Sequence, residues 1–409
     1  MFETKEHSQI KCEEIDISTL PLDFDSETKN VNYLNLSSSF HADYFIGVDW
    51  LVEEEYALAV YPKIDELDYV QMFIDCLSEP IIAKEINKNR GKQKIYDIYF
   101  DKSKIKIPAN RFEITPILII HFLSVVKKIV KKGLKKGYVR VQENLSSKVK
   151  GRILLSNTIK NNHVRNKHHK TFCSYQKFTS NCIENRILKK ALVFVSTYLT
   201  TVNLRKHNQI SQLLNFCMSA FENISDDVDI RKIKTLKSTN FFKEYEEGLK
   251  LAKMIMERFS YALDNATRNN ETVSVPFYIN MPLLFELYVF SKLKKAFRKN
   301  ILYQFHGKYG ETDFLDIENK TIIDAKYKEK YQLKYDIEDI RQLSGYSRDC
   351  KVLKKLNIDT VNPEIVDCLI IYPNQYDGKS EIITDIIKDE RIEGFVKFYK
   401  YGIKLPQKN

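Results

Sequence analysis

The stretch FLDIENKTIIDAKYK, which starts at position 314, constrains the fold of this chain most, because its strand pairing can be worked out from its own residues. A two-residue turn at Glu318 and Asn319 places Asp313 directly opposite Asp324 on the neighbouring strand. Cross-strand partners have Cβ atoms about 4.5–5.5 Å apart, and like charges there are destabilising unless something compensates. Side chains alternate along a strand, so Lys326 projects from the same face as Asp324. The sequence therefore predicts a hairpin that carries a carboxylate pair with an ammonium beside it.

The residues around this hairpin predict a helix, three strands, a second helix and a further strand. The first helix is indicated by an apolar stripe at helical spacing, and Glu286 falls within the angular spread of that stripe. Strands are expected at 301–305, in the hairpin itself and at 366–372, with the second helix at about 336–348. The residues of the apolar stripe are Leu283, Leu287, Phe290, Leu293 and Phe297. The second helix would place Asp339, Gln342 and Tyr346 on one face.

The length of 409 residues allows two or three domains. A content of 43% hydrophobic and 29% charged residues is ordinary for a folded protein and excludes wholesale disorder. We expect a multidomain protein of mixed α+β and α/β class, with an acidic mixed region at 1–115 that binds a partner. A basic, mainly helical region is expected at 116–275, because proline is absent between Pro116 and Pro276. The last domain is expected at 276–409, and residues 1–30 are interpreted as a loose acidic arm.

Charge is distributed very unevenly along the chain. Residues 1–70 contain 16 Asp and Glu against 4 Lys and Arg, whereas residues 127–190 contain 18 Lys and Arg against 2 Glu. Such a basic block commonly neutralises the phosphates of a nucleic acid. The alternative is a solvated lysine-rich surface. The residues that we expect to contact DNA are Lys148, Lys150, Arg152, Lys167 and Lys170.

Neither a membrane protein nor a disulfide-bonded secreted protein is indicated. No signal peptide opens the sequence, and the longest apolar run, 114–126, is broken by His121 and reads as a buried helix. Seven cysteines without a CxxC pair suit a reducing cytoplasm. A loose group of histidines and cysteines lacks the spacing of a zinc finger or knuckle, and consists of His163, His168, His169, Cys173 and Cys182.

The paired carboxylates suit a magnesium site. Phosphodiester hydrolysis needs an activated water, neutralisation of phosphate charge and stabilisation of the leaving oxygen, and Mg²⁺ held by carboxylates can serve all three. Mg²⁺ prefers oxygen ligands and commonly uses one or two carboxylates together with several waters. Asp313 and Asp324 are therefore the expected metal ligands, with the carbonyl of Ala325 as a third oxygen donor. An ordinary surface hairpin with an Asp/Lys ion pair is the alternative interpretation.

Three further residues are expected to assist. Lys326 would orient or help to deprotonate the attacking water, or stabilise the charged transition state. Glu286 would reach the site from the preceding helix, through a water or by holding Lys326. Gln342 would fix a phosphate or a water from the following helix. For Glu286 and Gln342 a structural role is an equal alternative, and Tyr327 and Tyr346 could stack on bases or simply pack.

At these residues the chain resembles the PD-(D/E)xK nuclease superfamily, whose core has the order αβββαβ. Thr312 stands where the motif has a leading proline. Three further strings, YVRVQENL from position 138, VKGRI from 149 and FTSNCIENR from 178, resemble the middle block of McrC proteins. With IIDAKYK and QLSGY following, the resemblance is to the McrC family and covers roughly residues 45–375.

That resemblance implies the Mg²⁺-dependent endonuclease subunit of a 5-methylcytosine restriction system used in antiviral defence. Its partners would be an McrB-like AAA+ GTPase hexamer, which the N-terminal part stimulates, and double-stranded methylated DNA. The chain has no GxxxxGK[ST] phosphate loop, so the nucleotide chemistry would belong to the partner. Two alternatives remain: a non-catalytic adaptor that stimulates a motor, and a stand-alone nuclease of DNA repair or processing.

Overall fold

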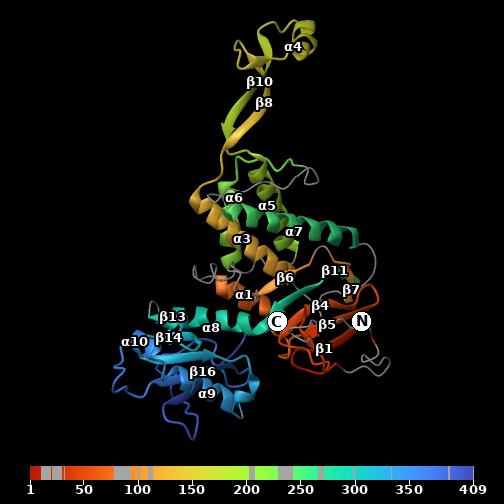
Figure 1. Cartoon of the computed structure of the whole chain (residues 1–409). Coiled ribbons are helices and arrows are strands. Elements are labelled where there is room, and N and C mark those ends of the chain that lie inside the picture. Colours follow the sequence, from red (N-terminus) through yellow and green to blue (C-terminus); the bar gives the residue numbers. More distant parts are fainter. Residues whose placement is uncertain are drawn as a thin grey trace. The chain divides into compact units, whose positions relative to one another are not determined.

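The computed structural model describes residues 1–10, 20, 30–31, 33–77, 94–99, 102–108, 114–201, 208–228, 243–265, 271–297, 300–332, 334–385 and 387–408. The chain divides into two compact units (Figure 1), one made of Met1–Glu113 together with Asn270–Asn409 and the other of Ile114–Asn269. The boundaries expected at 115 and 275 lie near these limits, but the regions expected at 1–115 and 276–409 share one unit. The N-terminal sheet explains why.

That sheet has five strands in the order β1-β5-β4-β12-β6, so a strand from beyond the middle region lies inside it. Its β12 pairs antiparallel with both β4 and β6. The close approach of β12 requires a glycine, since a Cβ on Gly47 (φ 145°) would lie 2.1 Å from the carbonyl oxygen of Phe277. The strands are β1 (Phe2–Lys5), β4 (Phe45–Val52), β5 (Tyr56–Tyr61), β6 (Tyr96–Ile98) and β12 (Phe277–Asn280).

The start of the chain differs from the loose arm expected at 1–30. Strand β1 pairs in parallel with β5, and Phe2 is buried in the apolar core that also includes Leu58 and Val60. Burying one aromatic ring is sufficient to fix this short edge strand. Most of residues 11–29 lie outside the described part of the chain. Around the sheet lie β2 (Asn30–Val31), β3 (Leu36–Ser37), α1 (Tyr69–Leu77) and the pair formed by β7 (Ile105–Pro108) and β11 (Glu271–Ser274).

A second five-stranded sheet follows, with the strand order β13-β14-β15-β16-β17. The first three strands are antiparallel, whereas β15, β16 and β17 run parallel. Leu315 pairs with Ile322, which is the register expected for the hairpin. The elements are α8 (Met281–Phe297), β13 (Ile301–His306), β14 (Glu311–Asp316), β15 (Thr321–Ala325), the 3₁₀ turn η6 (Glu329–Gln332), α9 (Ile337–Tyr346), α10 (Cys350–Lys355), β16 (Asp367–Pro373) and β17 (Phe398–Ile403). The helices and strands expected here are confirmed to within a few residues, and α10 and β17 are additional.

Helices pack against this second sheet through apolar side chains. Phe290 of α8 stacks on Phe314, with ring centroids 5.9 Å apart. On the α9 and α10 side, Leu343 packs in a cluster with Ile370, and Val352 packs in a neighbouring cluster with Leu315. Because these helices bury the sheet, polar side chains at the ends of its strands converge where β14 and β15 leave the core.

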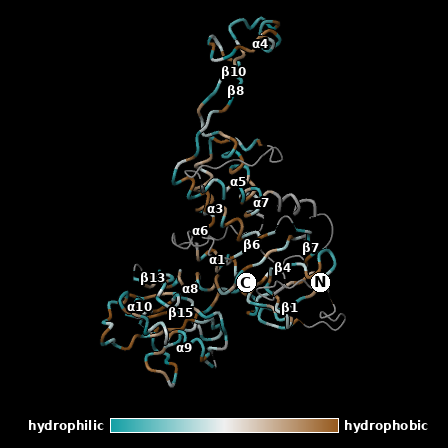
Figure 2. Tube along the Cα trace, viewed as in Figure 1, coloured by the Kyte–Doolittle hydropathy of each residue, from teal (hydrophilic) through white to brown (hydrophobic). Residues whose placement is uncertain are grey.

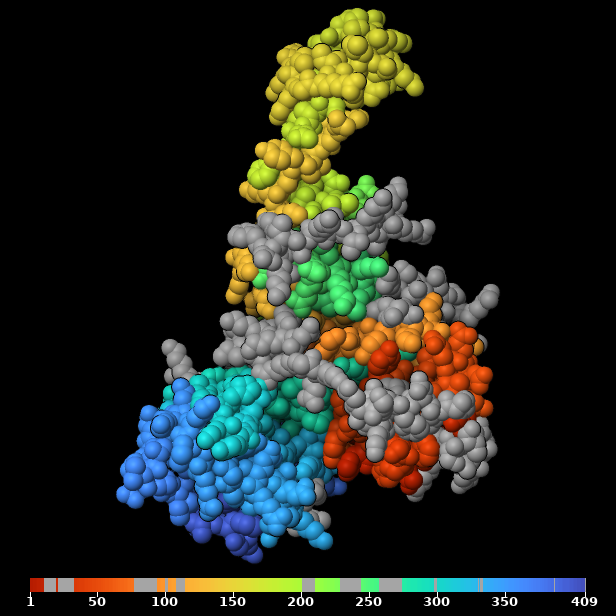
Figure 3. Space-filling view, in the orientation of Figure 1, coloured from red at the N-terminus to blue at the C-terminus, as the bar shows by residue number. Residues whose placement is uncertain are grey.

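The other unit consists of helices and a long hairpin (Figures 1 and 3). The expected helical region is present, but the hairpin formed by β8 and β10 was missed. Along β8 half-buried and exposed residues alternate, so neither face shows the continuous apolar pattern by which a strand is identified. At the end of the hairpin that carries α4, hydrophilic and hydrophobic segments alternate along the chain (Figure 2). The elements are α3 (Ile114–Lys132), β8 (Gly137–Ser146), β9 (Arg152–Ile153), α4 (Leu155–Asn161), η2 (His163–Arg165), β10 (Lys170–Thr179), α5 (Ile183–Thr201), α6 (Asn208–Ala220) and α7 (Lys243–Asn265).

The apolar run at 114–126 is part of α3, whose Ile117, Phe122 and Val126 are fully buried in the protein. In the part of the chain that the structure describes, no helix combines the length and apolar character needed to cross a membrane.

Candidate active site

The two aspartates of the hairpin lie together at the ends of β14 and β15. Oδ2 of Asp313 accepts a hydrogen bond from the backbone N–H of Ala325 at 2.8 Å. The pKa of Asp313 is raised well above its usual value, first by burial and then by the negative charges of Asp324 and Glu286. Asp324 is only 3% exposed. The site therefore gathers three carboxylates whose mutual repulsion a cation would relieve.

The ammonium of Lys326 lies among acceptors on both sides. Its Nζ is 2.7 Å from Oδ2 of Asp324 and donates to Oε1 of Gln342 at 2.9 Å. Burial alone would lower the pKa of Lys326, but the attraction of Asp324, Asp339 and Asp313 outweighs it, so the pKa is raised. Lys326 is therefore positively charged at neutral pH.

Glu286 reaches the site from α8 and is held there by an unexpected partner. Nε2 of Gln304 donates to Oε1 of Glu286 at 2.7 Å. Gln304 has a left-handed backbone (φ 46°). The strands β13 and β14 are paired on either side of it, at Tyr303–Phe314 and Phe305–Thr312, but not at Gln304 itself. Such irregularities re-aim a side chain and are common beside active sites. This irregularity could not be predicted from the residue itself, since glutamine has no preference for the left-handed conformation.

Asp339 of α9 is a central residue that the site prediction omitted. It is 6% exposed, and its Oδ2 accepts from the hydroxyl of Tyr331 at 2.5 Å and from Nζ of Lys328 at 2.8 Å. Its Oδ1 lies 3.6 Å from Nζ of Lys326. The sequence signal that could have identified Asp339 was its helical spacing, which places it on the same face of the helix as Gln342.

Gln342 also connects the site to the turn between β13 and β14. Its Nε2 donates to the hydroxyl of Tyr346 at 2.9 Å. The ring of Tyr346 lies against Gly310, where a Cβ would approach its Cε1 to 2.5 Å. Gly307 donates to the carbonyl of Gly310 at 2.8 Å, so the two glycines form a turn. Tyr327 is 4% exposed and packs in the core, so it is not available to stack on a base.

The side chains at this site have the chemistry that a magnesium ion requires. Asp324 is buried, and its Oδ2 is paired with the ammonium of Lys326 at 2.7 Å. Asp313 and Asp324 supply hard oxygen ligands, which Mg²⁺ prefers. Across the described ranges no group of three or more His, Cys, Asp or Glu is arranged to hold a metal ion. A site of this kind would complete its coordination with water and a substrate phosphate.

The five basic residues expected to contact DNA gather at the far end of the hairpin in the helical unit. All except Lys170, which begins β10 and is half-buried, are exposed. Nζ of Lys150 lies 4.4 Å from the centre of the Tyr175 ring. The rings of His163 and His168 lie 5.2 Å apart in the same region, whereas Cys173 is buried on β10. Lys148, Lys150, Arg152 and Lys167 are thus exposed residues in the segment that connects β8 with β10.

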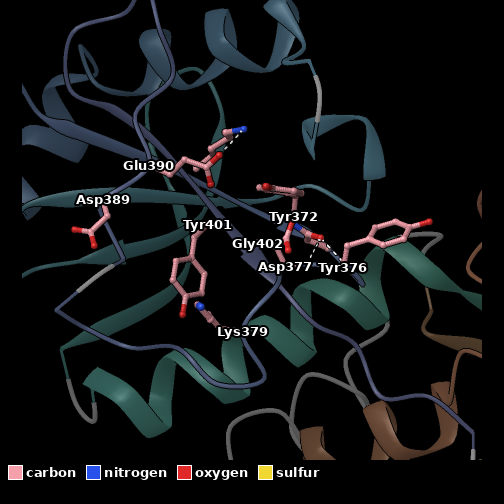
Figure 4. A pocket seen from close by; sticks show the side chains of 10 residues that line it. Tyr372, Tyr376, Asp377, Lys379, Asp389, Glu390, Tyr401 and Gly402 are labelled. Atoms are coloured by element: carbon pink, nitrogen blue, oxygen red, sulfur yellow. Dashed lines mark hydrogen bonds and ion pairs between the residues drawn. The ribbon is translucent and has the colours of Figure 1, made fainter.

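A polar pocket of about 400 Å³ opens at the ends of β16 and β17 (Figure 4). Its lining includes Tyr372, Lys379 and Tyr401, and Nζ of Lys400 forms an ion pair of 2.7 Å with Glu390. None of the expected site residues lines it.

A family model and solved structures match this chain. The family model described as "McrBC 5-methylcytosine restriction system component" matches residues 45–356. A half-complex from a tetradecameric assembly of Thermococcus gammatolerans McrB AAA+ hexamers with bound McrC matches at 17% identity and a TM-score of 0.37, over 89% of this chain and 78% of that chain. The T. gammatolerans McrBC complex matches at 15% identity and a TM-score of 0.30, over 75% and 79%. No curated protein matches. The family match covers well over half of the chain and includes Asp313, Asp324, Lys326 and Gln342.

Proposed function

The chain belongs to the McrC family of the McrBC 5-methylcytosine restriction system, and on that premise we propose that it is the DNA-cutting subunit of such a system. The reaction is the Mg²⁺-dependent hydrolysis of a DNA phosphodiester bond. One observation carries the proposal: two carboxylates and an ammonium, Asp313, Asp324 and Lys326, converge at the end of one hairpin. Exposed ion pairs of Asp and Lys are common on protein surfaces, but a cluster this buried is not.

The order of elements supports a PD-(D/E)xK nuclease core. The sequence α8, β13, β14, β15, α9, β16 follows the order αβββαβ that the resemblance implies. Asp313 and Asp324-Ala325-Lys326 occupy the motif positions on β14 and at the end of β15. Thr312, which stands where the motif has a proline, is buried on β14 directly before Asp313.

Asp313 and Asp324 would hold the metal ion, with the Ala325 carbonyl as a further ligand and Glu286 acting through a water. Bound Mg²⁺ supplies charge neutralisation at the phosphate and an acidified water. The mutual repulsion of the neighbouring carboxylates of Asp313, Asp324 and Glu286, which a cation would relieve, supports this assignment.

Lys326 stabilises negative charge on the phosphate rather than acting as a base, because its raised pKa keeps the amine protonated. Gln342 and Asp324 hold the ammonium from two sides, so it is oriented before substrate arrives. Asp339 positions the neighbouring Lys328 and Tyr331 and adds a negative charge near Lys326. These residues explain how a flexible lysine is kept in one place.

The proposed partners are an AAA+ GTPase hexamer of the McrB type and double-stranded methylated DNA. The acidic N-terminal region would bind the motor and stimulate it. The basic end of the hairpin would contact DNA phosphates, since its exposed Lys148, Lys150 and Lys167 present a concentrated positive charge.

A second candidate is a motor-stimulating adaptor that does not cut. It is favoured by one observation: within the described residues, no three His, Cys, Asp or Glu side chains are arranged so that together they could hold a metal ion. The intact Asp313, Asp324 and Lys326 count against it.

The deciding experiment measures plasmid cleavage by the full chain with its motor, GTP and Mg²⁺. We expect cleavage by the wild type and its loss in Asp324→Asn, while binding to the motor persists. Asp359→Asn, an exposed aspartate in the same part of the chain, is the matched control. Stimulated GTP hydrolysis without any cleavage by the wild type would establish the adaptor, and cleavage without motor or GTP would establish a stand-alone nuclease.

A further inference from the structure

A buried cluster joins the N-terminal sheet to the residue that follows Lys326. The hydroxyl of Tyr327 donates to Oε1 of Glu6 at 2.8 Å, and Nζ of Lys63 donates to the carbonyl oxygen of Tyr327 at 2.6 Å. Glu6 and Tyr327 are only 1% and 4% exposed. These contacts link residues 264 and 321 positions apart in the chain.

The N-terminal side of this cluster is rigid. Glu6 directly follows β1, and its backbone N–H binds the carbonyl oxygen of Tyr61 at the end of β5 at 2.8 Å. Oε1 of Glu6 also accepts from the backbone N–H of Lys63 at 3.0 Å. Glu6 and Lys63 are thus fixed to the ends of two paired strands and to each other.

The ring of Tyr327 is held as firmly as its polar atoms. Nζ of Lys63 lies 3.7 Å from the ring centre, in a cation–π contact. The rings of Phe285, next to Glu286 on α8, and Tyr44 pack against it with centroids 5.6 and 6.4 Å away. Every part of the Tyr327 side chain is therefore engaged from outside its own hairpin.

The peptide that carries Lys326 is consequently fixed at both ends. The backbone N–H of Lys326 donates to the carbonyl oxygen of Ile371 on β16 at 2.9 Å, and the carbonyl oxygen of the following residue, Tyr327, accepts from Lys63. Lys328, one residue further, is held by Asp336 and Asp339 of α9. A catalytic group must stay within about 0.5 Å of its productive position, so a shift of this peptide would remove Nζ from Asp324.

We propose that Glu6 and Lys63 are positioning residues through which the N-terminal sheet keeps the Lys326 ammonium in the active site. The inference rests on the proposed function for the role of Lys326, but the position of Lys326 can be measured without any cleavage. The hydrogen bonds and the cation–π contact of this cluster are buried, so their main effect is to favour one arrangement of the Tyr327 peptide over others. A sheet far from the hairpin in sequence thereby determines the reactivity of one lysine.

The test uses two variants of the full chain and two matched controls. Tyr327→Phe deletes only the hydroxyl that binds Glu6, and Lys63→Met removes only the ammonium. The controls remove the same chemical groups at exposed positions of the N-terminal sheet. Tyr61→Phe deletes a hydroxyl that donates to Glu3, and Lys5→Met deletes an ammonium that pairs with Asp65. Circular dichroism melting establishes that each variant is folded.

The first measurement is the rate at which Lys326 is methylated by formaldehyde and borohydride, resolved by mass spectrometry. Lys292, which is 5% exposed and bound to Glu381, is the internal reference. We expect a severalfold faster modification of Lys326 in Tyr327→Phe and Lys63→Met, because an amine that leaves Asp324 and Gln342 becomes more accessible to the reagent than one held between them. Rates equal to those of the controls in both variants would overturn the inference, whether or not the protein cuts DNA.

The second measurement is cleavage by the complex with its motor. If the wild type cuts, kcat should fall by about 10- to 100-fold in both variants with KM for DNA unchanged, as expected for a misplaced catalytic group. An unchanged kcat in both variants would also overturn the inference. If the wild type does not cut, the proposed function fails, and the methylation rates alone decide the inference.

Discussion

Nζ of Lys326 and Oδ2 of Asp324 lie 2.7 Å apart, on the same side of a strand end and separated by a single alanine. This pair is compatible with catalysis only if something keeps the carboxylate available, since an aspartate neutralised by lysine binds a cation weakly. Asp313 supplies a second carboxylate, and Lys326 also donates to Gln342. The charges of Asp324 and Lys326 therefore do not simply neutralise each other. The arrangement makes the roles of the three charged groups separable by experiment.

Replacement of Lys326 by methionine should lower the rate of DNA cleavage by about 10²–10³-fold, because it removes a charge placed at the phosphate. DNA affinity should change little, as one ammonium adds little to a large interface. Single-turnover plasmid nicking and a filter-binding assay measure the two quantities. Lys320→Met, which deletes an exposed ion pair with Glu364 on the same hairpin, is the control. A variant at Lys326 that cuts like the wild type would refute the site.

Replacement of Asp313 by asparagine should leave Tm unchanged or raise it when no divalent cation is present, since it removes a carboxylate that its neighbours repel. Added Mg²⁺ should raise the Tm of the wild type, corresponding to about 2.7 kcal/mol at a hundred times Kd, and should have little effect on the variant. Differential scanning calorimetry with and without Mg²⁺ makes the comparison. Equal Mg²⁺ stabilisation of both proteins would mean that the ion binds elsewhere.

Replacement of Glu6 by glutamine should flatten the pH dependence of stability. Burial raises the pKa of Glu6 from 4.5 to about 7 in the folded protein. Between those values the folded chain binds more protons than the unfolded chain, so the free energy of unfolding falls as pH rises. From pH 5 to pH 8 the wild type should lose about 2 kcal/mol more than Glu6→Gln.

Denaturant unfolding followed by Trp50 fluorescence measures this loss, because the chain has one tryptophan and it lies on β4 of the same sheet. Glu3→Gln, an exposed residue on β1, is the control and should behave like the wild type. Parallel pH curves for the wild type and Glu6→Gln would show that Glu6 titrates normally.

Alanine at Lys148, Lys150 and Lys167 together should weaken DNA binding and reduce the slope of log K against log salt by about 2 to 3, at about 0.9 for each lost phosphate contact. The control carries alanine at Lys127, Lys131 and Lys136, which are exposed in the same basic segment but lie outside the end of the hairpin. Fluorescence anisotropy over a salt series gives both slopes. An equal decrease in both triple variants would indicate a general effect of net charge.

Local pattern was sufficient to predict the site hairpin and the elements around it. The pairing of Leu315 with Ile322 follows from a short turn and strict alternation, and both are encoded within a few residues. The helix that contains Gln342 begins with Asp336, whose side chain accepts from the N–H of Glu338 as a typical N-cap. Local patterns such as these predict the structure correctly because no contact with a distant part of the chain overrides them.

Features that depend on distant contacts were not predictable. The left-handed backbone of Gln304 is set by its neighbours on β14 and by Glu286, not by its own preference. The contact between Glu6 and Tyr327 joins residues that no local pattern relates. The hairpin of β8 and β10 was missed because neither face of β8 is fully buried, so its residues show no continuous apolar pattern on one side.

The place of β12 between β4 and β6 also has a consequence for biosynthesis. A ribosome releases β4 and β5 more than two hundred residues before it releases β12, so the first strands must wait with one side unpaired while the inserted helical unit folds. Exposed strand edges of this kind are prone to aggregation, and a truncated product ending before residue 277 could not complete the sheet. Translation past β12 is therefore a condition for the N-terminal sheet, and fragments that end before this strand are poor substitutes for the whole chain.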